Sequence, residues 1–191
     1  MILKTSLEPN LYIALTHHPV VNKNGDTITS AVTNLDLHDM ARAARTYGVK
    51  EFYVVTPLED QKSLVEQILS HWIKGYGGQY NPKRRKALEL IRVVDTIEDV
   101  VEKISEKGMG TPRIVVTSAR ENRNMVTCKA LRSKLKNGYP YVLLFGTAWG
   151  LSEGVIDAAD HLLEPIRGME TYNHLSVRSA AAIILDRLLA P

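Results

Sequence analysis

Short apolar runs alternate with longer amphipathic stretches along most of this chain. Runs of strand length occupy residues 11–15, 52–56, 90–94, 114–117 and 141–145. Apolar residues at helical spacing occur between and after these runs, at 37–47, 64–73, 97–107, 126–135 and 177–188. Short strands that alternate with helices indicate an α/β protein with a parallel sheet covered by helices on both faces.

Ligands of such sheets bind at the loops that leave the carboxyl ends of the strands. The candidate loops follow Thr16, Thr56, Thr117, Phe145 and Ile166. The apolar run 141–145 ends in Gly146-Thr147-Ala148-Trp149-Gly150-Leu151, where two glycines let backbone amides approach a ligand. A second polar loop, Tyr172-Asn173-His174-Leu175-Ser176, leads into the last helix. These loops predict a small-molecule site in the last third of the chain.

Composition limits the class of protein. The chain has 191 residues, of which 45% are hydrophobic, and this is enough to bury the core of one domain. The formal net charge is only +3, so contact with nucleic acid requires a local basic patch. A single cysteine, Cys128, excludes an intrachain disulfide and fits a reducing compartment, so we expect a cytoplasmic protein. No apolar run approaches the roughly 18 residues of a membrane span, and we expect no membrane partner.

Several common catalytic motifs are missing from the sequence. The first strand ends in Thr16-His17-His18-Pro19 without the glycines of a dinucleotide fingerprint, and there is no P-loop. The missing motifs argue against an enzyme that uses a nucleotide to act on a small molecule and whose parallel sheet is not part of a knotted chain. Adjacent histidines on a strand point to opposite faces, and no Cys/His cluster has zinc spacing, so we expect no metal.

The C-terminal segments resemble the S-adenosylmethionine site of the SPOUT RNA methyltransferases. The resemblance lies in residues 144–151 (LFGTAWGL), 164–168 (EPIRG) and 172–183 (YNHLSVRSAAAI). Within that superfamily the chain is most similar to a small bacterial branch, met alone or joined to a tRNA (guanine-N1)-methyltransferase. The resemblance implies one SPOUT domain over residues 1–191, a deep trefoil knot at about 113–191, S-adenosyl-L-methionine as the cofactor and RNA (tRNA or rRNA) as the substrate. It also implies a homodimer in which each site is completed by the other subunit.

The resemblance assigns the cofactor site residue by residue. Backbone contacts should dominate, because glycines allow close approach of the chain to a ligand. The expected cofactor contacts are Thr117, Phe145, Gly146, Thr147, Trp149, Gly150, Leu151, Ile166, Gly168, His174 and Leu175.

Catalytic roles are expected for Arg42, Asn173 and Ser176. Arg42 stands six residues before Gly48, as the arginine of the ribose-methylating branch stands before a helix-ending glycine. That branch has asparagine at the positions of Asp36 and His174. The pattern favours the ribose 2′-oxygen as methyl acceptor over a base nitrogen.

Two alternatives to ribose methylation remain. For a base nitrogen, Asp36 or Asp39 would accept the proton. The second alternative is that the chain is a catalytically silent relative that binds RNA or a partner protein, because one fold hosts several functions.

A basic stretch supplies candidate RNA contacts. Residues 74–86 hold three glycines, two tyrosines and five cations without an acid, and we expect an exposed loop there. Its tyrosines would stack on unpaired bases while its cations meet phosphates, unless the loop is only a solvated surface. The expected RNA contacts are Tyr80, Arg84, Arg85, Arg120 and Arg123.

Overall fold

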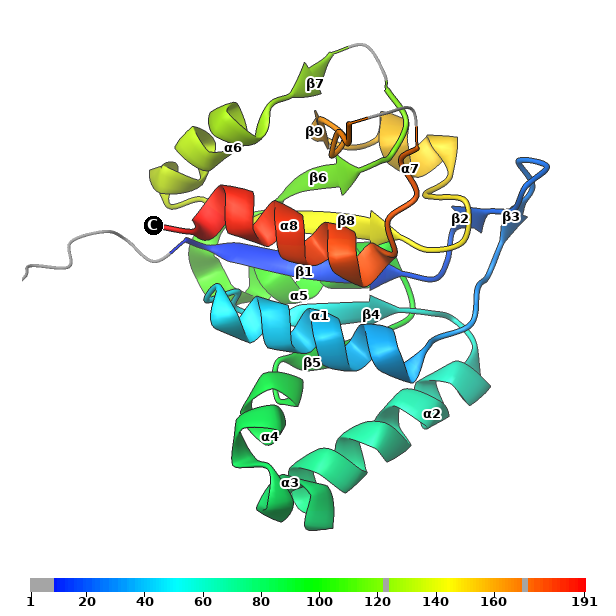
Figure 1. Cartoon of the computed structure of the whole chain (residues 1–191), viewed down its shortest axis with the longest axis vertical. Coiled ribbons are helices and arrows are strands. Elements are labelled where there is room, and N and C mark those ends of the chain that lie inside the picture. Colours follow the sequence, from blue (N-terminus) through cyan, green and yellow to red (C-terminus); the bar gives the residue numbers. More distant parts are fainter. Residues whose placement is uncertain (1–8, 122–123, 170–171) are drawn as a thin grey trace, which may run out of the picture.

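Seven parallel strands form the central sheet of the protein (Figure 1). The structure is a computed structural model and describes residues 9–121, 124–169 and 172–191. Across the sheet the strands are β5 (Ile91–Val94), β4 (Phe52–Val55), β1 (Leu11–Thr16), β8 (Tyr141–Gly146), β6 (Arg113–Thr117), β9 (His161–Leu163) and β7 (Met125–Val126). Every pairing in this sheet is parallel, and Ile13 at the centre of β1 pairs with Phe52 on one side and Leu143 on the other.

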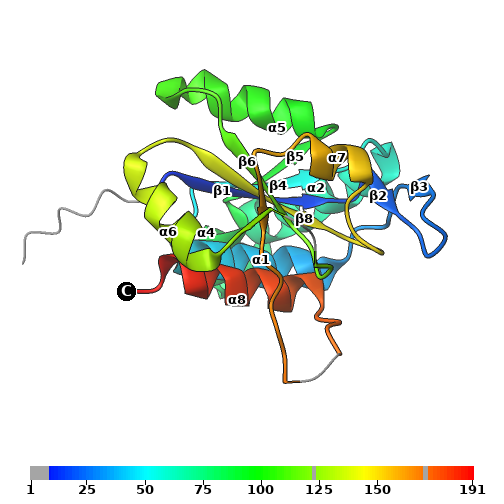
Figure 2. The same ribbon diagram turned by 90° about the horizontal axis from the view of Figure 1, so that it is seen from above.

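Helices cover both faces of the sheet (Figure 2). The helices are α1 (Asn34–Thr46), α2 (Glu59–Leu69), α3 (Tyr76–Tyr80), α4 (Pro82–Leu88), α5 (Ile97–Ile104), α6 (Cys128–Lys134), α7 (Glu153–Asp157) and α8 (Val177–Leu189). Shorter helical turns are η1 (Ser70–Lys74), η2 (Ser105–Met109) and η3 (Leu135–Asn137), and a small antiparallel hairpin joins β2 (Val20–Val21) to β3 (Thr27–Ile28). α1, α6 and α8 lie on one side of the sheet, and α5 and α7 lie on the other. The predicted α/β fold is confirmed.

The core divides into two clusters because alternate residues of a strand point to opposite faces. In β1, Leu11, Ile13 and Leu15 pack with α1 and α8, whereas Tyr12 and Ala14 belong to the cluster that includes α5. α8 lies beside α1, and a hydrogen bond from Tyr47 Oη to Asp186 Oδ1 (2.8 Å) joins the two helices. The last helix thus returns across the sheet next to the first.

The prediction of a loop at residues 74–86 is wrong. This segment forms α3 and α4, which extend with α2 from the body of the protein (Figure 1). Gly77 and Gly78 are buried, because α3 packs so closely against η1 that a Cβ on Gly77 would lie 2.8 Å from His71 Nε2. Glycine-rich sequence was therefore a sign of close helix packing here.

The remaining differences are local. Residues 125–126, expected next to and within a helix, form the edge strand β7, and the helix begins only at Cys128, where Thr127 accepts a hydrogen bond from Ala130 N. The β2–β3 hairpin and α7 were not predicted. Among the described residues, no helix is both long and apolar enough to cross a membrane.

Candidate functional site

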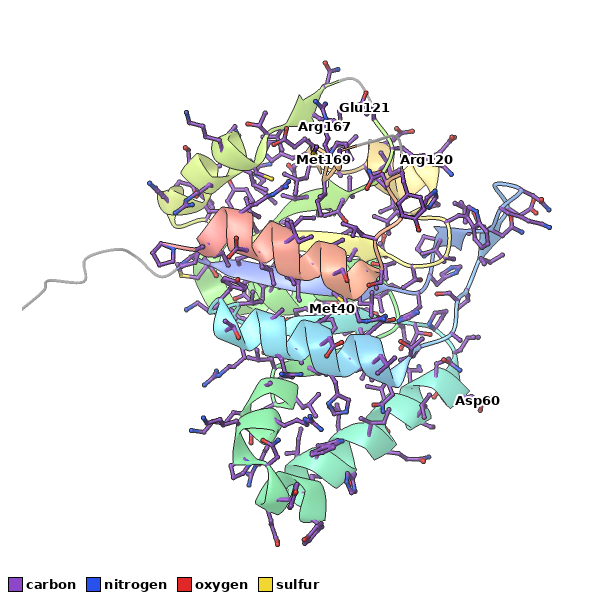
Figure 3. The ribbon with its side chains drawn as sticks, in the orientation of Figure 1. Met40, Asp60, Arg120, Glu121, Arg167 and Met169 are labelled. Carbon is purple, nitrogen blue, oxygen red and sulfur yellow. The ribbon has the colours of Figure 1, made fainter. Side chains whose placement is uncertain are left out.

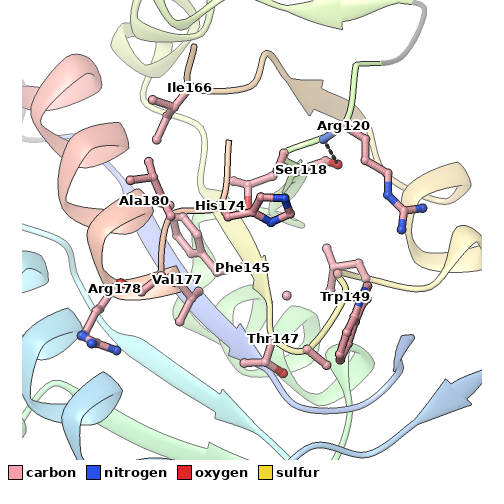
Figure 4. A pocket seen from close by; sticks show the side chains of 18 of the residues that line it. Ser118, Arg120, Phe145, Thr147, Trp149, Ile166, His174, Val177, Arg178 and Ala180 are labelled. Atoms are coloured by element: carbon pink, nitrogen blue, oxygen red, sulfur yellow. Dashed lines mark hydrogen bonds between the residues drawn. The ribbon is translucent and has the colours of Figure 1, made fainter. Parts of the chain in front are cut away.

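A cavity of about 900 Å³ opens at the carboxyl edge of the sheet (Figure 4). Its walls come from the loops after β6, β8 and β9, from the segment 173–176, from the start of α8 and from the residues before α1. A cavity of this size suits a ligand with the dimensions of a nucleoside and an amino acid joined together. Three of the five strand-end loops predicted from the sequence therefore meet at one place.

The loop after β8 is held in a tight turn. Gly150 has φ +111°, which favours glycine, and Ala148 also has a positive φ of 51°. A Cβ on Gly146 would lie 2.7 Å from the backbone nitrogen of Leu151, so the chain could not fold back so closely with a larger residue. Trp149 N donates to the carbonyl of Val21 at 3.1 Å, which fixes the loop against β2.

A chain of partly buried hydrogen bonds connects this loop to β1 and to His17. Thr147 Oγ1 donates to the carbonyl of Thr16 (3.0 Å) and contacts Ser30 Oγ at 2.5 Å, and Ser30 Oγ contacts His17 Nδ1 at 3.0 Å. His17 is fully buried. Burial lowers its pKa to about 4, against the opposing influence of Asp36, so the ring is neutral at pH 7. Ser30 and Thr147 line the cavity, and His17 holds Ser30 in place.

An ion pair between α1 and α8 also belongs to the cavity wall. Arg178 Nη1 on α8 binds Asp36 Oδ1 on α1 at 3.1 Å, and Thr33 Oγ1 donates to Asp36 Oδ2 at 2.6 Å. Arg178 Nε lies 3.6 Å from Asp39 Oδ2, and Arg42 Nη1 lies 3.6 Å from Asp39 Oδ1. Asp36 and Arg178 line the cavity, but Arg42 does not.

Arg42, predicted to be catalytic, therefore lies outside the cavity of its own chain. Its side chain is 60% exposed on the outer face of α1. Arg178, which no prediction assigned a role, is instead among the lining residues, and its guanidinium turns toward α1 (Figure 4). Its place at the second position of a helix that follows a polar loop was the signal for it, because side chains of a first helical turn project toward the preceding loop.

Asn173 and Ser176 shape the mouth of the cavity. Asn173 Nδ2 donates to the carbonyl of Ala119 at 3.1 Å, which ties the segment before α8 to the loop after β6. Ser176 caps α8 by accepting a hydrogen bond from Ser179 N at 3.3 Å. Both residues line the cavity, and their catalytic roles stay predictions.

All but one of the predicted cofactor contacts line the cavity. The cavity is lined by Thr117, Phe145, Gly146, Thr147, Trp149, Gly150, Leu151, Ile166, His174 and Leu175, whereas Gly168 does not line it. Arg120 also lines the cavity, and its neighbour Glu121 pairs with Arg167 at 3.1 Å on the rim (Figure 3). Tyr80, Arg84 and Arg85 lie on α3 and α4, away from the cavity, and Arg123 lies outside the described residues.

The charges of the wall are balanced. Two cations, Arg120 and Arg178, and two anions, Asp36 and Glu164, belong to a lining that is otherwise mostly apolar and small polar. A phosphate-rich ligand would need an excess of cations or a glycine-rich phosphate loop. A ligand with both a positive and a negative group fits this wall. An α/β sheet with such a cavity, lined by three convergent strand-end loops, defines a small-molecule-binding protein.

Comparison with known proteins gives the family. The sequence profile of a family described as SAM-dependent RNA methyltransferase matches residues 10–190. The chain belongs to this family, whose methyl donor is S-adenosylmethionine, and the predicted family and cofactor are confirmed.

Two relatives have similar sequences. A tRNA (guanine-N(1)-)-methyltransferase of Oleidesulfovibrio alaskensis is 44% identical over 180 residues, which are 94% of this chain and 42% of that protein. An uncharacterized protein of Aquifex aeolicus is 37% identical over 185 residues, which are 96% of this chain and 90% of that protein. The chain thus spans less than half the length of the relative with a named activity.

The fold is shared with a structure that holds the cofactor. The SpoU methyltransferase AviRb from Streptomyces viridochromogenes, in complex with the cofactor AdoMet, matches with a TM-score of 0.56 and 16% identity. The match covers 96% of this chain and 58% of that chain. This likeness shows that the chain shares the α/β fold of that protein.

Proposed function

We propose that this chain binds S-adenosylmethionine in the cavity and transfers its methyl group to RNA, with tRNA as the substrate. The convergence of the loops after β6, β8 and β9 on one cavity of about 900 Å³ carries the proposal. The relative from Oleidesulfovibrio alaskensis supports tRNA as the substrate class.

The residues of the cavity fit this cofactor. Ile166 and Leu175 offer apolar surface for the adenosine, and the turn at Gly146 would bring backbone groups against the ligand. The balanced charges of the wall suit a molecule that carries a sulfonium, an ammonium and a carboxylate. When bound, the cofactor supplies an electrophilic methyl group, so the main task of the protein is to place the acceptor in line with it.

Two acceptor atoms compete within this proposal. The spacing of Arg42 favours a ribose 2′-oxygen. The name of the Oleidesulfovibrio alaskensis relative instead points to a guanine nitrogen, although that activity could belong to the part of the relative that this chain does not match. The carboxylate of Asp36 in the cavity wall is a candidate proton acceptor for a base nitrogen, but both of its oxygens are already hydrogen-bonded. Both the ribose 2′-oxygen and the guanine nitrogen are therefore candidate methyl acceptors in this proposal.

The knot and the dimer are parts of the same proposal. We infer that the chain is one domain in which residues from about 113 onward are threaded as a trefoil. The return of the chain after β9 to place α8 beside α1 supports this arrangement. We also infer a homodimer in which the exposed Arg42 of one subunit reaches the acceptor at the cavity of the other. This would give Arg42 a catalytic role despite its place outside its own cavity.

Labelled methyl transfer tests the function. The protein would be incubated with methyl-labelled S-adenosylmethionine and either tRNA or rRNA from a strain that lacks the gene, followed by digestion and nucleoside analysis. We expect label in tRNA, and the modified nucleoside identifies the acceptor atom. Cofactor binding by titration calorimetry without transfer to either RNA would instead favour the catalytically silent alternative.

A matched pair of variants tests Arg42. Arg45 lies on the same helix, is also exposed and does not line the cavity. We expect Arg42→Ala to lower the rate of transfer at least about tenfold, or 1.4 kcal/mol, without a change in cofactor affinity. Arg45→Ala should have little effect. Equal rates for the two variants would refute the proposed role of Arg42.

A further inference from the structure

We propose that the arm formed by η1, α3 and α4, residues 70–88, is a platform on which unpaired nucleotides of the RNA substrate stack. This rests on the proposed function, because it takes RNA as the substrate. The arm lies at the end of the molecule away from β7 and β9, next to the edge strand β5 and beside α1 (Figure 1). It is separate from the cavity, whose lining contains none of its residues.

Two exposed tyrosines form the centre of the platform. Tyr76 is 72% exposed and Tyr80 is 77% exposed. Their rings are stacked, with centroids 6.3 Å apart and planes inclined by 25°. Two neighbouring aromatic rings that remain in water present flat apolar faces, and such faces bind nucleobases without regard to sequence.

The same arm carries several cations. Lys74, Lys83 and Lys86 are exposed, and in the described part of the chain none of them forms a salt bridge. No acidic residue occurs between residues 74 and 88. The surface of a protein with a net charge of only +3 is thus locally cationic at this point, which suits a phosphate backbone.

The platform is fixed in position before any ligand binds. Trp72 on η1 joins the arm to α1: the guanidinium of Arg84 lies 4.7 Å from its ring centroid, and the ring centroid of His38 on α1 lies 5.3 Å away. Asn81 caps α4 by accepting a hydrogen bond from Arg84 N at 3.0 Å. The buried Gly77 and Gly78 hold α3 tightly against Trp72 and His71. A rigid surface loses little entropy when it binds, so the exposed rings are suited to recognition.

The combination of rings and cations favours a single strand over a duplex. A duplex exposes its phosphates but keeps its base faces stacked on one another, so the tyrosines would have no partner. Unpaired bases, as in an RNA loop, can stack on aromatic side chains while the backbone contacts lysines. An acidic protein surface would meet the cations but would not need two parallel rings.

Binding of short RNAs tests the proposal. The 191-residue chain would be titrated with a fluorescently labelled 12-nucleotide single strand and with the same sequence as a duplex, and binding would be followed by anisotropy. We expect the single strand to bind more tightly. Tyr76→Ala with Tyr80→Ala should raise its Kd at least about tenfold, whereas the double Phe variant, which keeps the rings, should stay within about twofold of wild type. Lys83→Ala should reduce the slope of log K against log salt by about 0.7, the value for one phosphate of a single strand.

The controls separate this proposal from the cofactor assignment. Tyr139→Ala and Lys129→Ala remove an exposed tyrosine and an exposed lysine elsewhere and should leave the Kd unchanged. Cofactor affinity, measured by calorimetry on the same samples, should be equal in all variants. Duplex binding as tight as single-strand binding, no RNA binding at all, or unchanged binding by the double Ala variant would overturn the platform while leaving the cofactor site intact. If the wild-type protein bound RNA but did not bind the cofactor, only the proposed function would be overturned.

Discussion

The buried His17 makes the stability of the protein depend on pH in a way that can be calculated. Its pKa falls from 6.5 to about 4 on folding, chiefly because burial disfavours the charged ring. The unfolded chain therefore binds a proton below pH 6.5 that the folded chain does not bind until about pH 4. The free energy of unfolding should fall as the pH drops through this window. From this shift the loss is about 2 kcal/mol at pH 5 and approaches about 3 kcal/mol at pH 4.

His17→Asn isolates this contribution. Asparagine keeps a polar group near the position of Nδ1, which contacts Ser30 at 3.0 Å, but it does not titrate. Urea unfolding of both proteins, followed by circular dichroism from pH 7.5 to pH 4.5, gives the difference in unfolding free energy at each pH. Subtracting the two profiles cancels the other histidines and the carboxylates.

The expected result has a definite sign. The variant should be less stable at pH 7.5, because it loses the packing of the ring, and the gap should narrow by about 2 kcal/mol as the pH falls to 5. Parallel profiles would mean that His17 keeps an ordinary pKa. The hydrogen bonds that link His17 through Ser30 to Thr147 would then include a charged ring below about pH 6.5, and burial would not have lowered the pKa of His17.

Two further predictions concern the cavity and the single cysteine. Gly146→Ala, whose Cβ would lie 2.7 Å from the nitrogen of Leu151, should weaken cofactor binding at least about tenfold in calorimetry, whereas Gly154→Ala, whose Cβ would meet nothing within 4 Å, should not; equal affinities would show that the turn is not needed. Cys128 is buried, and burial raises the pKa of its thiol, so a disulfide reagent at pH 8 should modify the native protein at least about tenfold more slowly than the urea-unfolded one; similar rates would contradict its burial.

The sheet was predictable because its strands are short, apolar and separated by helices of regular period. The arm was not, because its glycines and asparagine read locally as turn residues. In the structure Gly77 and Gly78 allow contact with Trp72, and Asn81 caps a helix. Tertiary packing decided the conformation there, and a local sequence pattern carries no information about tertiary packing.

The site was predictable in its loops but not in its cross-links. The glycines after β8 mark a close approach of backbone that any reading of the sequence can find. Arg178 and Asp36 are separated by 142 positions in the chain, and Ser30 and Thr147 by 117. Only the folded sheet brings these pairs together, so the polar lining of the cavity required the structure.

The ion pairs on α1 and α8 explain how an aspartate and an outward arginine can belong to one site. Asp36 is held on both oxygens, by Arg178 and Thr33, and therefore acts first as an anchor that holds Arg178 against α1 at the edge of the cavity. Asp39 lies between Arg178 and Arg42, at 3.6 Å from each, in an exposed position where such pairs contribute less than about 1 kcal/mol. Breaking the pair between Arg42 and Asp39 therefore costs little. The chain of charges thus runs from a fixed end in the cavity to a free end at the surface, which is the geometry needed if a second subunit completes the acceptor site.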